Sequence, residues 1–204
     1  MKKVKNVFLL ALLLIPMLFH SQIRFGIRGT VHASNVSNIH KESGSRIAGS
    51  LGALAQIPIG YSNQFFLQPE ISYSLQGEND KGESYGVRRD AQYFQNYINI
   101  PVYFRAYFSE ADNEFFGEIG PQIGFLVFRK DKEEDTSIHE GGYAFLDKPQ
   151  SIDISIGIGI GYSFLRRYEV FVRYNYGLTD VYKNDRFGQQ RTSVLAGGFA
   201  YVFD

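Results

Sequence analysis

The chain has 204 residues, 21 basic and 21 acidic side chains, and no cysteine. Its length suits a single domain, and its balanced charge gives no reason to expect nucleic acid as a partner. The lack of cysteine excludes a lipid-anchored lipoprotein, and no segment beyond the N-terminal region is long and apolar enough to span a membrane as a helix.

The N-terminal region has the composition of a signal peptide. Lys2, Lys3 and Lys5 precede an apolar run at Val7–Phe19, and Ser21 supplies a small residue near a cleavage point. The run is shorter than the roughly 20 residues that a transmembrane helix needs. We therefore expect residues 1–21 to be removed and residues 22–204 to form one exported domain, which enters a membrane only as a barrel.

The exported part consists of segments in which large apolar residues alternate with polar or small ones, the pattern of strands with two unlike faces. The predicted strands, in chain order, are Ile23–Val31, Arg46–Ile59, Gln64–Gln76, Gln92–Phe108, Glu114–Phe128, Ile152–Phe164, Tyr168–Tyr176 and Thr192–Phe203. Their connections are long at 34–45, 77–91, 129–150 and 177–191, and short at 60–63, 109–113 and 165–167. An even number of strands with this alternation is typical of outer-membrane barrels, whose short turns face the periplasm.

The segment Ile152–Phe164 has the strongest pattern. Every even position is large and apolar, and every odd position between them is polar or tiny. Strands of soluble sandwiches are usually shorter, although an unusually long sandwich strand remains the alternative for this segment. We expect lipid on its isoleucine face and a crowded interior on its glycine face. The predicted fold is all-β: a monomeric, eight-stranded antiparallel up-and-down transmembrane β-barrel in the outer membrane, with a plugged polar lumen.

Aromatic residues lie near the strand ends on the apolar face, as two belts at the membrane interfaces predict. They are Phe25, Phe65, Tyr73, Phe94, Phe108, Phe115, Tyr162, Phe164, Tyr168, Tyr174, Tyr176 and Tyr201. Pro69 and Pro121 lie in mid-strand, where a missing N–H weakens the ladder. A bulge would be tolerated at either position.

Charged residues of both signs lie on the inward face. They are Arg24, Arg28, Glu70, Arg105, Glu118, Asp153, Glu169 and Arg173. A barrel of about eight strands has a lumen that side chains alone can fill, and charges enclosed there need partners. The pattern predicts a lumen closed by ion pairs and hydrogen bonds, with inward glycines making room. A narrow path for water or ions is the functional alternative.

The search for chemistry yields two weak candidates. His32 with Ser34 at the outer rim suggests a hydrolase pair, but no carboxylate at a fixed offset completes a triad. The acidic run at 131–135 with Glu140 offers calcium ligands without a defined spacing. A lipid-modifying enzyme would line one lumen end with apolar residues, whereas the inward set found here is charged. We therefore predict no catalysis, no metal and no cofactor.

The C-terminal strand ends in the aromatic pair Tyr201 and Phe203, which resembles the signal read by the barrel-insertion machinery. Asp204 after the last aromatic departs from that signal. The expected partners are outer-membrane lipid, this insertion machinery, and other envelope proteins that the long outer loops contact.

Short motifs in a characteristic order cover nearly all of the mature chain. They are Phe25–Gly29 with Ser34–Val36, then Leu67–Ser74, Tyr97–Val102, Gly120–Leu126, Gly157–Tyr162 and Arg173–Asp180. The chain thereby resembles the outer membrane protein β-barrel domain family, in its PorT-type group of small porin-like proteins. The resemblance implies fold and location, and transfers no catalytic residue; one branch is tied to protein secretion. We expect a structural, adhesive or envelope-complex accessory role, with a narrow porin or a lipid-modifying enzyme as alternatives.

Overall fold

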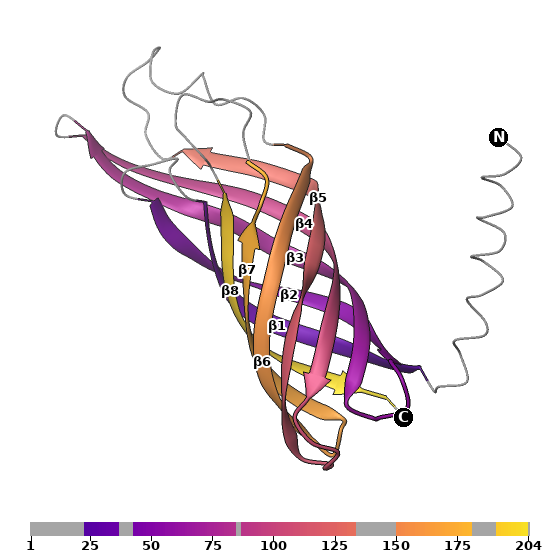
Figure 1. Ribbon diagram of the computed structural model, residues 1–204. Coiled ribbons are helices and arrows are strands. Elements are labelled where there is room, and N and C mark those ends of the chain that lie inside the picture. The colour runs from indigo at the N-terminus through magenta and orange to yellow at the C-terminus, as the bar shows by residue number, and fades with distance from the viewer. Residues whose placement is uncertain (1–22, 37–42, 85–86, 134–149, 181–190, 204) are drawn as a thin grey trace, which may run out of the picture.

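The computed structural model describes residues 23–36, 43–84, 87–133, 150–180 and 191–203. Eight strands form one closed antiparallel barrel, which confirms the predicted fold (Figure 1). They are β1 (Arg24–Val36), β2 (Ser43–Pro58), β3 (Phe65–Ser84), β4 (Val87–Tyr107), β5 (Glu114–Glu133), β6 (Ile152–Phe164), β7 (Tyr168–Gly177) and β8 (Thr192–Val202).

The barrel closes by pairing its first strand with its last. β1 and β8 pair from Gly26↔Val202 to Val36↔Thr192, and every other strand pairs with its neighbours in sequence. Closure gives each strand a partner on both sides, which removes the two open edges that a flat sheet of these strands would present. In the described part of the chain, no helix is long and apolar enough to cross a membrane.

The strand boundaries agree with the predictions at the short turns and differ at the long loops. β6 and the turn at 165–167 match their predicted ranges. The predicted loop at 77–91 is wrong, because β3 and β4 continue as a paired hairpin as far as Ser84↔Val87. β5 likewise continues to Glu133, and β1 to Val36. Alternation marks a strand only where its two faces meet different media, so these polar extensions gave no signal.

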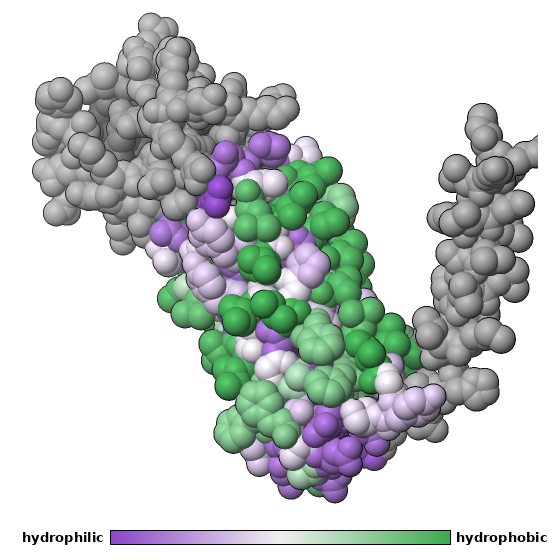
Figure 2. Space-filling model, in the orientation of Figure 1, coloured by the Kyte–Doolittle hydropathy of each residue, from purple (hydrophilic) through white to green (hydrophobic). Residues whose placement is uncertain are grey.

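The apolar face of each strand points outward, and the polar or small face points into the lumen. On β6, the five isoleucines from Ile152 to Ile160 are 41–58% exposed, whereas Ser155 and Ser163 are buried. Figure 2 shows the resulting apolar surface over the middle of the barrel, with more hydrophilic residues at its ends. About half of each isoleucine side chain is therefore exposed on the outer wall, which is the arrangement that a lipid-facing surface requires.

Outward aromatic side chains form clusters near the end of the barrel that carries the short turns, called here the short-turn end. One cluster joins Phe115, Tyr162 and Phe164, with ring centroids 4.8 Å and 4.7 Å apart. Another joins Tyr168, Tyr201 and Phe203, with centroids 5.1 Å and 5.3 Å apart. Such clusters suit the interface between headgroups and hydrocarbon.

The bulges of the barrel do not lie at its mid-strand prolines. Pro69↔Val102 and Pro121↔Ile156 keep the register of the pairs around them. Each residue of an antiparallel ladder bonds to only one neighbour, so a proline deletes one bond without shifting the strand. In contrast, the register shifts where the four residues 46–49 of β2 lie opposite the three residues 75–77 of β3. A second shift lies where β4 pairs with β5 beyond Tyr97.

Two predictions lie outside the described residues. The signal peptide at residues 1–21 is one of them. The other is the acidic run with Glu140, of which only the backbone up to Glu133 is described. Both stay predictions.

Candidate functional site

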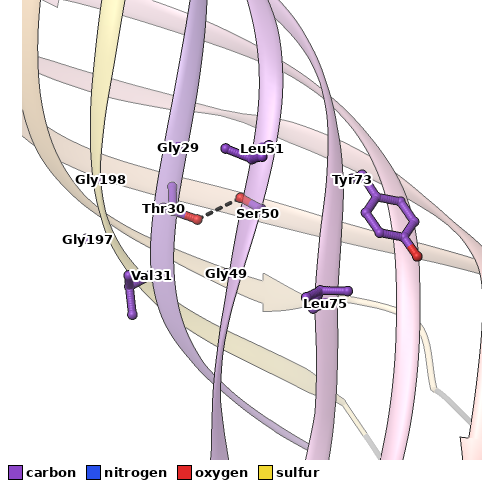
Figure 3. Close-up of a pocket in the computed structure, with 10 residues that line it drawn as sticks. All are labelled: Gly29, Thr30, Val31, Gly49, Ser50, Leu51, Tyr73, Leu75, Gly197 and Gly198. Carbon is purple, nitrogen blue, oxygen red and sulfur yellow. Dashed lines mark hydrogen bonds between the residues drawn. The ribbon is translucent and has the colours of Figure 1, made fainter.

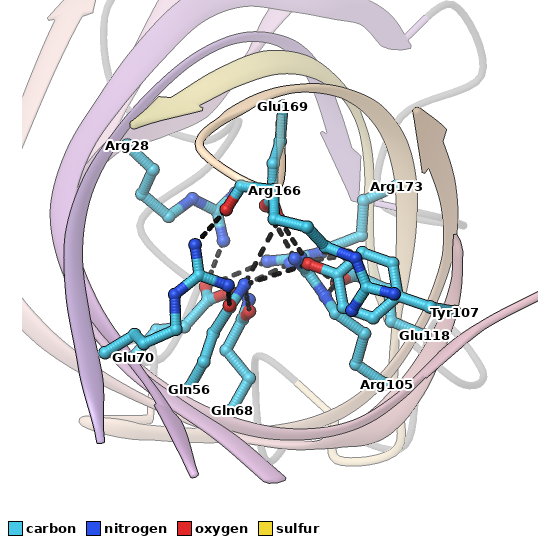
Figure 4. A network of polar contacts seen from close by, with 11 residues as sticks. Arg28, Gln56, Gln68, Glu70, Arg105, Tyr107, Glu118, Arg166, Glu169 and Arg173 are labelled. Atoms are coloured by element: carbon cyan, nitrogen blue, oxygen red, sulfur yellow. Dashed lines mark hydrogen bonds and ion pairs between the residues drawn. The ribbon is translucent and has the colours of Figure 1, made fainter. Parts of the chain in front are cut away.

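The lumen contains a network of three arginines and three glutamates, all buried. β1 contributes Arg28, β3 Glu70, β4 Arg105 and β5 Glu118, while β7 contributes both Glu169 and Arg173. Figure 4 shows these side chains converging on the barrel axis from around the wall. Three positive and three negative charges balance, which is the condition for enclosing them away from water.

Arg173 and Arg105 are the centres of this network. Arg173 binds Glu70 with two nitrogens, at 2.9 and 3.0 Å, and its Nε donates to Glu118 at 2.7 Å. Arg105 donates to the other oxygen of Glu118 at 2.7 Å and to Glu169 at 2.6 Å. Arg28 also pairs with Glu70. Both of the central guanidinium groups therefore bridge two carboxylates, an arrangement that uses their planar array of donors.

Two glutamines close the chain of ion pairs into a ring. Gln56 donates to Glu169 at 3.1 Å and to Gln68 at 3.2 Å. Gln68 donates in turn to Glu70 at 2.7 Å. Tyr107 adds a bond of 2.7 Å to Glu169 from the short-turn side. Nothing in the sequence pattern indicated that the two glutamines would link the two ends of the charged series.

Each network arginine also lies over an aromatic ring. Arg105 lies 3.9 Å from the ring centroid of Phe116, and Arg173 lies 3.9 Å from that of Tyr103. Arg28 lies 4.8 Å from the centroid of Phe171. A cation over an aromatic face is attracted by the ring quadrupole, most strongly where water is excluded. The aromatic rings therefore compensate part of the hydration that the arginines lose.

β6 and β8 make room for the network by contributing small inward residues. Gly159 pairs with Glu118 on one side and with Arg173 on the other. A Cβ at Gly159 would lie 2.9 Å from Glu118 Oε1. Ala200 of β8 lies between Arg28 and Glu169 in the same way. Large charged side chains on five strands thus meet across the lumen because β6 and β8 leave them space.

Two of the eight predicted lumen charges do not join the ion pairs. Arg24, four residues before Arg28 on β1, donates to the carbonyl of Arg166 and to Gln56 at 3.5 Å. Asp153 accepts hydrogen bonds of 2.9 Å from Thr179 and Thr192. Asp153 precedes Gly159 by six positions, about 20 Å along a strand. Alternation assigned both residues to the correct face, but it carries no information on height along the axis.

The short-turn end of the lumen is apolar, which corrects the expectation of a wholly charged inward face. Its buried cluster consists of Leu54, Phe66, Tyr107, Phe116, Phe171, Ala200 and Val202. Phe66 and Phe116 both pack edge-on against Tyr107, with centroids 5.5 and 5.6 Å away. The cluster fills this end with rings, and the charged network lies directly above it.

Arg166, in the turn between β6 and β7, ties the short turns together. Its guanidinium pairs with Glu114 and donates to the carbonyls of Asn63, Ala111 and Ser109 at 2.5, 3.1 and 3.1 Å. The guanidinium also lies 4.2 Å from the ring centroid of Tyr107. One side chain thereby connects three turns and covers the apolar cluster. The sequence predicted only a turn here, because the partners are backbone carbonyls that no side-chain pattern reveals.

His32 and Ser34 do not form a hydrolase pair. His32 donates from Nε2 to the carbonyl of Leu75 at 2.9 Å. Ser34 donates to the carbonyl of Gly77 at 2.8 Å and accepts from its N–H at 3.2 Å. Leu75 and Gly77 are the β3 residues at the register shift, where the ladder with β2 is interrupted. The two side chains thus hydrogen-bond to backbone groups at the bulge, where the extra residue disrupts the ladder with β2.

No group of three or more potential ligands that would hold a metal ion occurs within the described segments. What the network does chemically follows from its contacts. Each of the three carboxylates accepts hydrogen bonds or ion pairs from donors on other strands of the barrel.

A sequence model of the family described as "Outer membrane protein beta-barrel domain" matches residues 17–183. No curated protein matches the chain. Solved structures with a similar fold include the following three. The outer membrane enzyme PagL is 13% identical, with a TM-score of 0.48 and coverage of 84% of this chain and 98% of its own. The attachment invasion locus protein Ail of Yersinia pestis is 10% identical, with a TM-score of 0.46 and coverage of 90% and 100%. Neisserial surface protein A is 14% identical, with a TM-score of 0.45 and coverage of 90% and 100%.

Proposed function

The chain belongs to the outer membrane protein β-barrel domain family and lies in the outer membrane, and we propose that it is a closed, non-catalytic member of this family. It acts through the surface that it presents above the membrane, in a structural, adhesive or accessory role within the envelope. Its lumen serves stability. It works as a monomer, and it contacts other envelope proteins through its long outer loops.

The observation that carries this proposal is the ring of buried ion pairs across the lumen. Arg105, Glu118 and Arg173 have side chains no more than 2% exposed. Aromatic residues fill the lumen below them, and Arg166 spans the short turns at the mouth. In an eight-stranded barrel, side chains that fill the axis in this way support a lumen without a continuous water path.

The outer parts of three strands support the proposal that the protein acts through its surface above the membrane. β3, β4 and β5 have 20, 21 and 20 residues, whereas β6, β7 and β8 have 13, 10 and 11. The longer strands extend past the others at the end opposite the short turns (Figure 1). Crossing the hydrocarbon layer takes about 9–11 residues per strand, so the additional length stands outside it and offers a rigid platform for contacts.

The motifs that resemble the PorT-type group favour an accessory role in protein secretion within the envelope. Crosslinking in intact envelopes tests this proposal, with a photoreactive residue placed at Ser84 on the tip of the β3–β4 hairpin. A control carries the residue at Tyr61 in the turn between β2 and β3. We expect a protein partner from the hairpin position. Partners recovered only from the turn position would contradict a role of the outer surface.

A narrow porin is the alternative that the same lumen allows if its charges admit water. Single-channel recording in planar bilayers separates the two functions. We expect no steady conductance steps from the protein. The double variant Arg105→Ala with Glu118→Ala removes two opposite charges together and is expected to conduct. Reproducible steps from the unaltered protein would overturn the closed-lumen proposal.

A further inference from the structure

A groove of roughly 540 Å³ lies on the outward wall over β8, β1, β2 and β3 (Figure 3). Its sides are the exposed apolar side chains of Val31, Leu51, Tyr73 and Leu75. It lies at mid-height of these strands, among exposed apolar side chains of the barrel wall. The medium around such a position is hydrocarbon rather than water.

Three outward glycines form the floor of the groove. Val31 pairs with Gly49 on β2 and with Gly197 on β8, while Gly29 pairs with Leu51. A hollow one side chain deep therefore runs across three strands. A Cβ built on Gly197 meets no atom within 4 Å, so the space above this glycine is open.

The groove lies beside the register shift between β2 and β3, and its lining is apolar for a structural reason. The Leu75 and Gly77 carbonyls lie where the ladder with β2 is interrupted, and His32 and Ser34 donate hydrogen bonds to them from the lumen side. The hydroxyls of Thr30 and Ser50 bond to each other at 2.6 Å. The polar groups at the shift are thus engaged, which leaves an apolar hollow facing the membrane.

One wall of the groove carries a polar group. The hydroxyl of Tyr73 accepts a hydrogen bond of 2.8 Å from the Asn96 amide at an exposed position on the outward face. A tyrosine hydroxyl that accepts a bond still has its own proton to donate. An outward asparagine is not suited to hydrocarbon, so this pair marks the start of the interfacial layer on the long-loop side.

We propose that the groove binds one acyl chain of a membrane lipid, whose headgroup oxygen accepts a hydrogen bond from Tyr73. This site is separate from the lumen and does not depend on the proposed function. The ten residues that line the groove fall well short of the roughly 20–30 residues on each side of a stable protein interface. A lipid chain fits a hollow of this kind without a matching partner surface, and hydrocarbon already surrounds it.

Photolabelling in vesicles tests this site. The purified barrel is reconstituted in phosphatidylcholine that contains a fraction of lipid with a photoreactive group on the acyl chain, and labelled peptides are identified by mass spectrometry. We expect labelling of residues 29–31, 49–51 and 73–75 to exceed that of the opposite wall on β5 and β6. Equal labelling of both walls would mean bulk lipid contact only and would overturn the proposal.

Variants of two outward glycines sharpen the measurement. Gly197→Leu fills the groove from a position where an added Cβ meets no atom within 4 Å, and it should reduce labelling there about tenfold, the equivalent of roughly 1.4 kcal/mol. Gly117→Leu is the matched control on the opposite wall, where a Cβ meets only the Phe108 ring at 3.6 Å. Gly197→Val replaces the leucine variant if the latter folds poorly. Equal groove labelling in the filled and control variants would refute the site.

Tyr73→Phe keeps the groove and removes the donor. We expect a smaller loss of groove labelling than with the filled variant, and unchanged labelling would exclude the headgroup contact. Crosslinks between two copies of the chain at Val31 or Leu51 would instead identify a protein contact, and would overturn the lipid assignment.

Discussion

Glu118 joins the part of the lumen network around Arg105 to the part around Arg173. One of its oxygens accepts from Arg105 and the other from Arg173, and its side chain is fully buried. Without it, two guanidinium groups would each lose a carboxylate while remaining enclosed in the barrel. Removing one partner of a buried pair is costly because an uncompensated charge stays behind.

We therefore expect Glu118→Gln to lower the free energy of unfolding by about 3–5 kcal/mol. The measurement is urea-induced unfolding in lipid vesicles, followed by gel mobility. Glu110→Gln, in the exposed turn between β4 and β5, is the control and should change the free energy by less than about 0.5 kcal/mol. Equal stability of the two variants would mean that the network does not hold the barrel together.

In the turn between β6 and β7, an unfavourable backbone conformation is offset by side-chain contacts with other turns. Leu165 and Arg166 both have left-handed backbone conformations, with φ of 54° and 55°. Such conformations disfavour residues with a Cβ and are better suited to glycine or asparagine. Leu165 is exposed and gains little in return, whereas the Arg166 side chain bonds to two other turns.

Asparagine at these two positions should therefore have opposite effects. Leu165→Asn is expected to raise the free energy of unfolding by about 0.5–1 kcal/mol, because it relieves the backbone and removes little packing. Arg166→Asn relieves the same conformation but deletes the bonds to the turns, so we expect a net loss of about 1.5–3 kcal/mol. Vesicle unfolding measures both variants, and a loss of stability in both would show that backbone strain is unimportant in this turn.

At the scale of the whole molecule, stability depends on the closure of the barrel by β1 and β8. These strands pair over eleven positions, from Gly26↔Val202 to Val36↔Thr192. The network residues are brought together only when all eight strands close around them, because Arg28 lies on the first strand and Arg173 on the seventh. We therefore expect barrel closure and lumen packing to form together on folding and to be lost together on unfolding.

An intact barrel of this kind should resist mild detergent at room temperature and unfold on boiling. We expect unboiled and boiled samples to migrate differently on gels. A chain that ends at Arg191 lacks β8 and cannot close, so its two samples should migrate alike. Identical migration of the full-length samples would contradict a stable closed barrel.

Much of the fold was predictable from alternation alone. The range Ile152–Phe164, the turn at 165–167 and the outward face of the isoleucines follow from a period of two between unlike media. The same period assigned all eight lumen charges to the inward face. The alternation did not predict the polar extensions of β3, β4 and β5. Water lies on both sides of these extensions, so their two faces need not differ.

By itself, the sequence determined which side chains face lipid and which face the lumen, because strand geometry converts odd and even positions directly into two faces. The tertiary structure alone decided which inward residues meet. Strand register sets the height of each residue along the axis, and it placed Arg28, Arg105 and Arg173 at one level while leaving Arg24 and Asp153 toward the two ends. Register depends on pairing between strands far apart in the chain, and no local pattern encodes it.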